Sequence, residues 1–112
     1  MPKYIGFARD AHDWESMTEA EIQQAMERYV EWSEELKRAG HAVDGGPVGD
    51  DVKVLRREAE LMVADGPYVE SKEVLGGVAI VEAADLDEAV RLFGTHPHLE
   101  FGSIEVRELG EL

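Results

Sequence analysis

The stretch LGGVAIVE at residues 75–82 and the stretch AADLDEAVRLFG at residues 83–94 predict a strand followed directly by a helix. Val78, Ile80 and Val81 lie close together with none of the charged residues that mark a helical period, which is typical of a buried strand. Successive side chains of a strand point to opposite faces, so both faces of this strand are apolar. We therefore expect a sheet that is covered on both sides.

The helix after this strand begins with a capping pattern. Asp85 and Glu88 have the spacing at which side-chain oxygens bind the free amides of a helix start, and Gly94 supplies a stop. The apolar residues of the segment form a narrow stripe of Leu86, Ala89, Val90 and Phe93. This helix is predicted to pack one face on the sheet.

A longer helix is predicted upstream. Thr18 and Glu21 repeat the capping spacing, and Gly40 follows Lys37 and Arg38, whose charges complement the negative end of the helix dipole. The apolar face recurs at three- and four-residue intervals through Ile22, Ala25, Met26, Tyr29, Trp32 and Leu36. One face of this helix is expected to pack and the other to be solvated.

Further segments have the composition of strands. Residues 3–8 and 103–109 predict the first and the last strand. Residues 41–43 predict a short strand that ends in the Asp-Gly-Gly-Pro turn at 44–47. Residues 52–63 predict a small hairpin that extends the main sheet.

This order of elements predicts one domain over residues 1–112, with a ferredoxin-like α+β fold. Both helices cover one face of a mostly antiparallel sheet, as in a split β-α-β arrangement. The other sheet face is apolar and needs a cover. We therefore expect a homodimer in which a second copy stacks sheet on sheet, forming a closed or half-closed barrel.

Composition excludes several classes of protein. The chain has 112 residues with 25 acids, 11 bases and no cysteine, for a net charge of −14. Without cysteine there are no disulfides, thiolate zinc sites or cysteine nucleophiles. The anionic field repels phosphate backbones, so we expect no direct nucleic-acid binding. The apolar stretch at residues 74–81 is far shorter than the roughly 20 residues of a membrane span, and no signal-peptide pattern is visible, so we expect a cytoplasmic protein.

The segment DGPYVESKEVLGG at residues 65–77 combines an Asp-Gly-Pro-aromatic turn, an acidic-Ser-Lys-Glu step and a Gly-Gly strand entry. This combination closely resembles the signature of the DGPF group in the YCII-related family. The likeness continues through residues 84–89 and 97–107. It is tight over the C-terminal half of the chain and extends to the layout of the N-terminal half.

The resemblance implies a dimeric α+β barrel, which agrees with the fold expected from the residues. It also implies enzymatic activity based on a His and an Asp, and a link to sigma factors, because some relatives are fused to sigma-factor domains. Two features of this chain depart from the family pattern. The first helix holds no His, although members of the wider family carry one there, and Val78 stands where the DGPF group commonly has an aromatic residue.

Asp65 and His98 are the candidates for acid–base chemistry. The turn of Asp65, Gly66 and Pro67 would deliver the carboxylate to a pocket mouth beside the sheet, where partial desolvation favours general acid or base use. The simpler interpretation is that these three residues only form a turn. His98 is chosen because it lies in the Pro-His-Leu step that resembles the signature.

Candidate ligand-binding residues surround this pair. They are Gly66, Pro67, Tyr68, Lys72 and His96. Lys72 would bind an anion or carboxylate, or only balance neighbouring glutamates. His96 and His98, on an extended segment, would turn both rings to one side and bind a metal, or lie in a solvated loop where His98 bonds a backbone carbonyl. We predict no metal and no cofactor.

The leading functional hypothesis is a small homodimeric domain that binds a small polar ligand in a pocket beside the sheet. The first alternative is an enzyme that uses Asp65 and His98 as an acid–base pair on a small substrate. The second is an interaction module in sigma-factor transcription regulation, where the acidic surface would meet a basic protein patch. Catalysis requires the two side chains within hydrogen-bond reach, whereas binding requires only a concave site.

Overall fold

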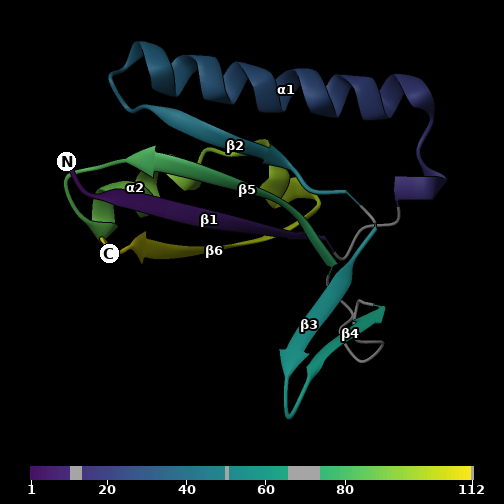
Figure 1. Ribbon diagram of the computed structural model, residues 1–112. Coiled ribbons are helices and arrows are strands. Elements are labelled where there is room, and N and C mark those ends of the chain that lie inside the picture. The colour runs from purple at the N-terminus through teal and green to yellow at the C-terminus, as the bar shows by residue number, and fades with distance from the viewer. Residues whose placement is uncertain (11–13, 50, 66–73, 112) are drawn as a thin grey trace.

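A computed structural model describes residues 1–10, 14–49, 51–65 and 74–111 (Figure 1). In chain order its elements are β1 (Lys3–Asp10), the 3₁₀ turn η1 (Trp14–Ser16), α1 (Glu19–Arg38), β2 (Val43–Pro47), β3 (Lys53–Arg57), β4 (Leu61–Asp65), β5 (Val74–Glu82), α2 (Leu86–Phe93), the 3₁₀ turn η2 (Pro97–Glu100) and β6 (Gly102–Leu109).

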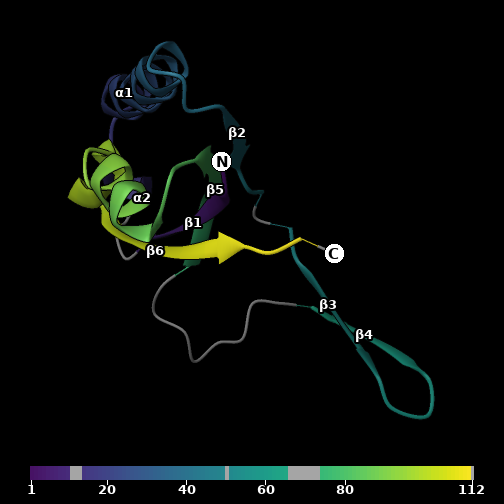
Figure 2. The same ribbon diagram turned by 90° about the vertical axis from the view of Figure 1, so that its left-hand side faces the viewer.

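The main sheet has the strand order β2-β5-β1-β6, and every neighbouring pair is antiparallel. Both helices lie on the same side of it (Figure 2). This is the predicted ferredoxin-like α+β fold, so the fold class is confirmed. The crossovers through α1 and α2 each skip one strand, which is filled by a strand from the other half.

Both helix starts are capped as predicted. The Thr18 hydroxyl accepts the Glu21 amide at 3.1 Å, and the Glu21 carboxylate accepts the Thr18 amide at 3.1 Å, which completes a capping box. In α2, the Asp85 carboxylate accepts the Glu88 amide at 2.8 Å. Of the predicted α2 stripe, Ala89 and Phe93 are buried against the core, whereas Leu86 and Val90 are 49% and 53% exposed. The buried face of α2 is therefore narrower than predicted.

The hydrophobic core lies between the sheet and the end of α1 that is nearest to α2. It is made of Tyr4, Trp32, Leu36, Val81, Ala83, Ala89 and Phe93. Gly6 in β1 leaves room for the Phe93 ring, since a Cβ at residue 6 would lie 2.5 Å from the ring carbon Cε1. A small residue in the strand thus lets α2 pack closely on the sheet.

The expected turn at residues 44–47 is wrong, because these residues form most of β2. The strand runs from Val43 to Pro47 along β5. Pro47 lacks an amide and fits only where a strand is an edge, which β2 is. Gly45 takes a φ of +109°, a value that favours glycine. The turn-forming residues therefore describe an irregular edge strand.

The expected extension of the main sheet by a hairpin is also wrong. β3 and β4 pair with each other as a separate two-stranded sheet, from Lys53 opposite Asp65 to Arg57 opposite Leu61. Figures 1 and 2 show this hairpin projecting from the body on the side opposite the helices. We call the hairpin, residues 53–65, the arm. The hairpin itself was predicted correctly, but its free projection was not.

Candidate functional site

A cavity of about 570 Å³ lies between α1 and the helix-facing side of the sheet. Its floor is made of residues with little or no side chain, namely Gly6, Ala8, Gly45, Gly77 and Ala79. They are registered next to one another on β1, β5 and β2. Because no large side chain rises from these positions, α1 cannot close onto the sheet here, and the space remains open.

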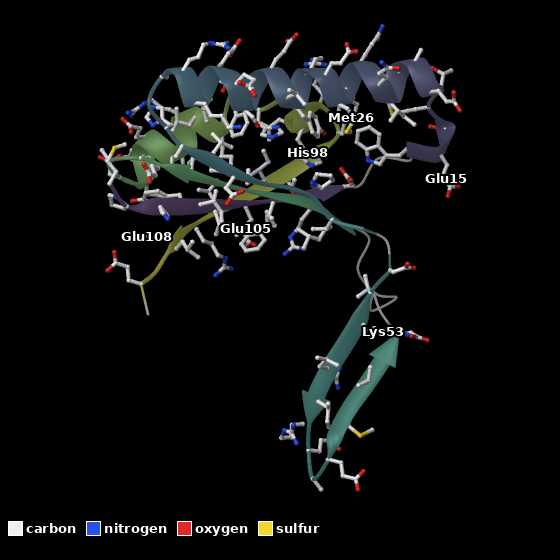
Figure 3. The ribbon with its side chains drawn as sticks, turned by 45° about the horizontal axis from the view of Figure 1, so that its top comes forward. Glu15, Met26, Lys53, His98, Glu105 and Glu108 are labelled. Atoms are coloured by element: carbon white, nitrogen blue, oxygen red, sulfur yellow. The ribbon has the colours of Figure 1, made fainter. Side chains whose placement is uncertain are left out.

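The walls of the cavity are mainly aromatic and apolar. They include Trp14, Met26, Tyr29, Trp32 and Phe93. Figure 3 shows Met26 and His98 between α1 and the sheet. A volume of this size falls in the range of small-molecule sites, and such sites are mostly apolar with a few convergent polar groups.

His98 is the central polar group of the cavity wall, and it is only 2% exposed. Its Nδ1 lies 2.8 Å from the Tyr29 hydroxyl oxygen. Its Nε2 lies 3.0 Å from the Arg9 carbonyl oxygen and 3.4 Å from the Asp10 carboxylate oxygen Oδ1. Nε2 faces two acceptors and therefore carries the proton of the neutral ring, so Nδ1 accepts from the Tyr29 hydroxyl.

Asp10, the last residue of β1, is the carboxylate next to His98. Its Oδ1 is the one buried side-chain oxygen or nitrogen without a hydrogen bond in the described part of the chain. Gly76 makes room for it, because a Cβ there would overlap the other carboxylate oxygen, Oδ2. A register shift in the β1–β5 pairing at Ala8 and Arg9 lies directly beside it. Such irregularities re-aim side chains next to functional sites.

Gly102 provides the corresponding space for His98. A Cβ at this position would overlap the Arg9 carbonyl oxygen and lie 3.1 Å from the imidazole Nε2. The approach of the imidazole to β1 therefore depends on a glycine at the start of β6.

Tyr29 brings a hydroxyl from α1 to the cavity. Burial raises the pKa of this phenol, and the nearby charge of Asp10 raises it further. The next residue toward the N-terminus, Arg28, binds the Glu100 carboxylate through both terminal nitrogens at 2.7 and 2.6 Å. This contact ties α1 to η2 beside the Tyr29–His98 bond. Because its pKa is raised, the Tyr29 phenol stays protonated at neutral pH.

His96 shapes the wall next to His98. Its Nδ1 accepts the His98 amide at 2.9 Å, so in the neutral ring the proton is on Nε2. Burial, and to a lesser extent the neighbouring His98, lower the His96 pKa to about 4. Its ring lies against Trp32, with 4.3 Å between the ring centroids. His96 is thus a neutral hydrogen-bonding residue at neutral pH.

The structure does not form the expected pair of Asp65 and His98. Asp65 is the last residue of β4, its side chain is 85% exposed, and it forms an ion pair with Lys53. Figure 3 shows Lys53 on the arm, away from His98. The carboxylate beside His98 is Asp10, because the hairpin carries Asp65 away from the helix-facing side of the sheet.

The remaining expected residues are placed only in part. Gly66, Pro67, Tyr68 and Lys72 lie outside the described residues. His96 and His98 are not on an extended segment, since His96 caps the 3₁₀ turn that contains His98. Their ring planes are 86° apart. Of the side chains described, no group of three His, Cys, Asp or Glu could hold a metal ion.

Asp10 and Tyr29 were not selected from the sequence. Asp10 looks like a polar strand end, and Tyr29 fits the apolar stripe of a helix. Each comes from a different element, so no local spacing joins them to His98. The sequence signal that could have pointed to the site is a pair of glycines. Gly76 and Gly102 have no packing role visible in the sequence, and in the structure Gly76 borders Asp10 and Gly102 borders His98.

Fold and site together define a small α+β domain in which the buried His98 lies between the partly buried Tyr29 and Asp10 at a cavity. The chain matches the YCII-related domain family over residues 3–112, and it belongs to that family. The YCII family is a family of dimeric α+β barrels, in agreement with the fold described above. None of the curated proteins compared with the chain matches it. Among the described residues, no helix has the length and apolarity to cross a membrane.

Proposed function

We propose that this chain binds a small molecule in the cavity under α1 and moves a proton on it with Tyr29, His98 and Asp10. The observation that supports this proposal is the buried His98 ring, bonded to a phenol on one side and next to a carboxylate on the other. A ligand of this cavity has an apolar body, for the aromatic and aliphatic walls, and a polar group that reaches Tyr29.

The directions of the hydrogen bonds suggest how the proton would move. The Tyr29 hydroxyl donates to Nδ1 of His98, so it can give this proton to the ring while its oxygen takes one from the ligand. The ring then carries a positive charge. Asp10 Oδ1, 3.4 Å from Nε2, stabilises that charge as the carboxylate does in a nucleophile-His-Asp triad. Many isomerase and lyase reactions begin with proton abstraction from carbon, and we favour these as the reaction class.

Binding can be tested without knowing the ligand. The chain contains two tryptophans, Trp14 and Trp32, and both line the cavity. We expect fragments with one ring and one hydroxyl, carbonyl or amine group to change the intrinsic fluorescence. Ala79→Phe, which fills the floor, should abolish the change while circular dichroism stays the same. If no fragment alters the fluorescence of the wild type, the binding proposal is wrong.

Proton transfer is tested on the fragments that bind. We expect the wild type to exchange a carbon-bound hydrogen of at least one fragment for deuterium in D₂O, as measured by NMR. Tyr29→Phe keeps the ring and should bind within a few-fold, but slow the exchange about 100-fold or more, the usual contribution of an acid–base group. Binding with unchanged exchange in Tyr29→Phe would contradict the assigned chemistry.

The same proposal includes a homodimer formed through the helix-free face of the sheet. By alternation from the buried Val81, that face carries Ile5, Phe7, Val78 and Ile80. Ile5 is paired with Ile80 and Phe7 with Val78, and all four are only half-buried in a single chain. These residues form an apolar patch on the two central strands, bordered by charged residues of the edge strands β2 and β6. An apolar patch with a polar border is typical of an interface.

A further inference from the structure

The arm stands apart from the body of the protein. The radius of gyration is 15.9 Å, whereas a compact chain of this length has about 13 Å. Figures 1 and 2 agree that the arm points away from the helices, past the free face of the sheet. Arm and free face therefore form two sides of an open angle.

The arm exposes apolar side chains that would be stabilised by burial against a partner. A lone two-stranded hairpin is at best marginally stable in water. One face of this hairpin carries Leu55, Leu61 and Val63, which are 62%, 52% and 58% exposed. Pairing places Leu55 opposite Val63 and Arg57 opposite Leu61 on that face, with the Lys53–Asp65 ion pair at one end. We call the three apolar residues the arm stripe.

We propose that the arm clasps a second copy of this chain, seated on the free face of the sheet, through the arm stripe. The inference rests on the homodimer proposed above and adds a second, separate contact to it. The arm projects past the free face, so it can contact a molecule that is bound on that face. With two-fold symmetry each copy offers one free face and one arm, so both arms are satisfied at once.

The distribution of charge favours a copy of this chain as the occupant. The arm has three bases and three acids, so its net charge is zero, while the remaining residues have 22 acids and eight bases and hold the whole charge of −14. The arm is therefore the segment that can approach a second anionic body with the least repulsion. A strongly basic partner would instead fit the acidic body and leave the neutral arm unused.

The area also favours a contact beyond the sheet. Four strands of five to nine residues cover roughly 500 Å² on one face, at about 4.8 Å per strand and 3.4 Å per residue. A standard interface buries roughly 800 Å² on each partner. The two five-residue strands of the arm add roughly 160 Å² per face, by the same spacings. The arm brings the contact closer to the area of a stable dimer.

The test uses two neighbouring arm residues with equal exposure. Leu61 and Met62 are both 52% exposed but point to opposite faces of the hairpin. We expect sedimentation to show a wild-type dimer. Leu61→Glu should raise its dissociation constant about tenfold or more, while Met62→Glu should change it less than about threefold. Ile80→Glu, on the sheet face, should also dissociate the dimer.

The outcomes separate the arm from the sheet. A dimer that is lost in Ile80→Glu but unchanged in Leu61→Glu would overturn the clasp and leave the sheet dimer standing. A monomeric wild type would overturn both. Equal losses in Leu61→Glu and Met62→Glu would overturn the arm stripe as the contact. Far-UV circular dichroism of each variant shows that the main fold is intact.

Discussion

The ring of His98 and the carboxylate of Asp10 can approach each other because two neighbouring residues are glycines, which have no Cβ. Gly102 admits the ring and the Arg9 carbonyl, and Gly76 admits the carboxylate. A Cβ at either position would require one of the site groups to move. The site thus depends on missing side chains as much as on those that are present.

Gly102→Ala tests this dependence. The added Cβ overlaps the Arg9 carbonyl, so we expect the free energy of unfolding to fall by about 2 kcal/mol or more, the range for overpacking. Gly46→Ala is the matched control, because nothing lies within 4 Å of its Cβ, and it should change stability by less than about 0.5 kcal/mol. Urea denaturation measures both. Equal stability of the two variants would contradict the packing argument.

His96 predicts a pH dependence of stability. Its pKa is about 4 in the folded chain and about 6.5 when unfolded, so the unfolded chain binds more protons between these values. The free energy of unfolding should therefore fall as the pH falls from 6.5 to 4. His96→Asn keeps a side-chain acceptor for the His98 amide but does not titrate. Its denaturation midpoint should depend less on pH in this window; an unchanged dependence would assign it to other groups.

Among the elements, α1 carries one side of the site and is held at several points. The Trp32 indole donates to the Leu92 carbonyl at 3.2 Å and to the Thr95 hydroxyl at 3.0 Å. Arg28 binds Glu100 on η2. These contacts place Tyr29, one turn before Trp32, over His98. The position of the helix is set by contacts to the α2–η2 segment, while the floor beneath it stays open.

Thr18→Ala tests the start of this helix. Loss of the capping box should lower the free energy of unfolding by about 1 kcal/mol, the usual value for such a cap. Gln24→Ala, at an exposed position of the same helix, should change it by less than about 0.5 kcal/mol. Thermal and urea melts provide the comparison. A Thr18→Ala variant as stable as Gln24→Ala would show that the cap contributes little.

The whole molecule combines a strong negative charge with a helix-free sheet face that is apolar at its centre and with a projecting arm. Its extents of 48 × 42 × 18 Å describe a flat body extended by the arm. Two such chains, each with a charge of −14, repel one another before their apolar surfaces meet. The proposed dimer therefore balances apolar burial against charge repulsion.

Added salt should strengthen this dimer. The interaction between exposed charges falls off over about 30 Å at 0.01 M salt and about 8 Å at 0.15 M, so the repulsion between the two bodies weakens as salt is added. We expect the dissociation constant, measured by sedimentation, to fall several-fold as NaCl rises between these concentrations. A dissociation constant that rises with salt would instead indicate an interface held by ion pairs.

The helices, the strand at β5, the hairpin and the α+β order were predictable from local patterns. Capping pairs, apolar periodicity and strand composition act over a few residues, so the sequence carries them directly. The signature around residues 65–77 pointed to the YCII-related family, which the match over residues 3–112 confirms. Of the three residues proposed to move the proton, Tyr29, His98 and Asp10, His98 was selected from the sequence.

The partner of His98, the cavity and the direction of the arm depended on tertiary structure. Asp10, Tyr29 and His98 come from β1, α1 and η2, and only the packing of those elements brings them together. The cavity exists because small residues of three strands fall side by side in the register of the sheet. Local sequence determines which elements form, whereas contacts between distant segments determine which side chains meet, because no short-range spacing encodes them.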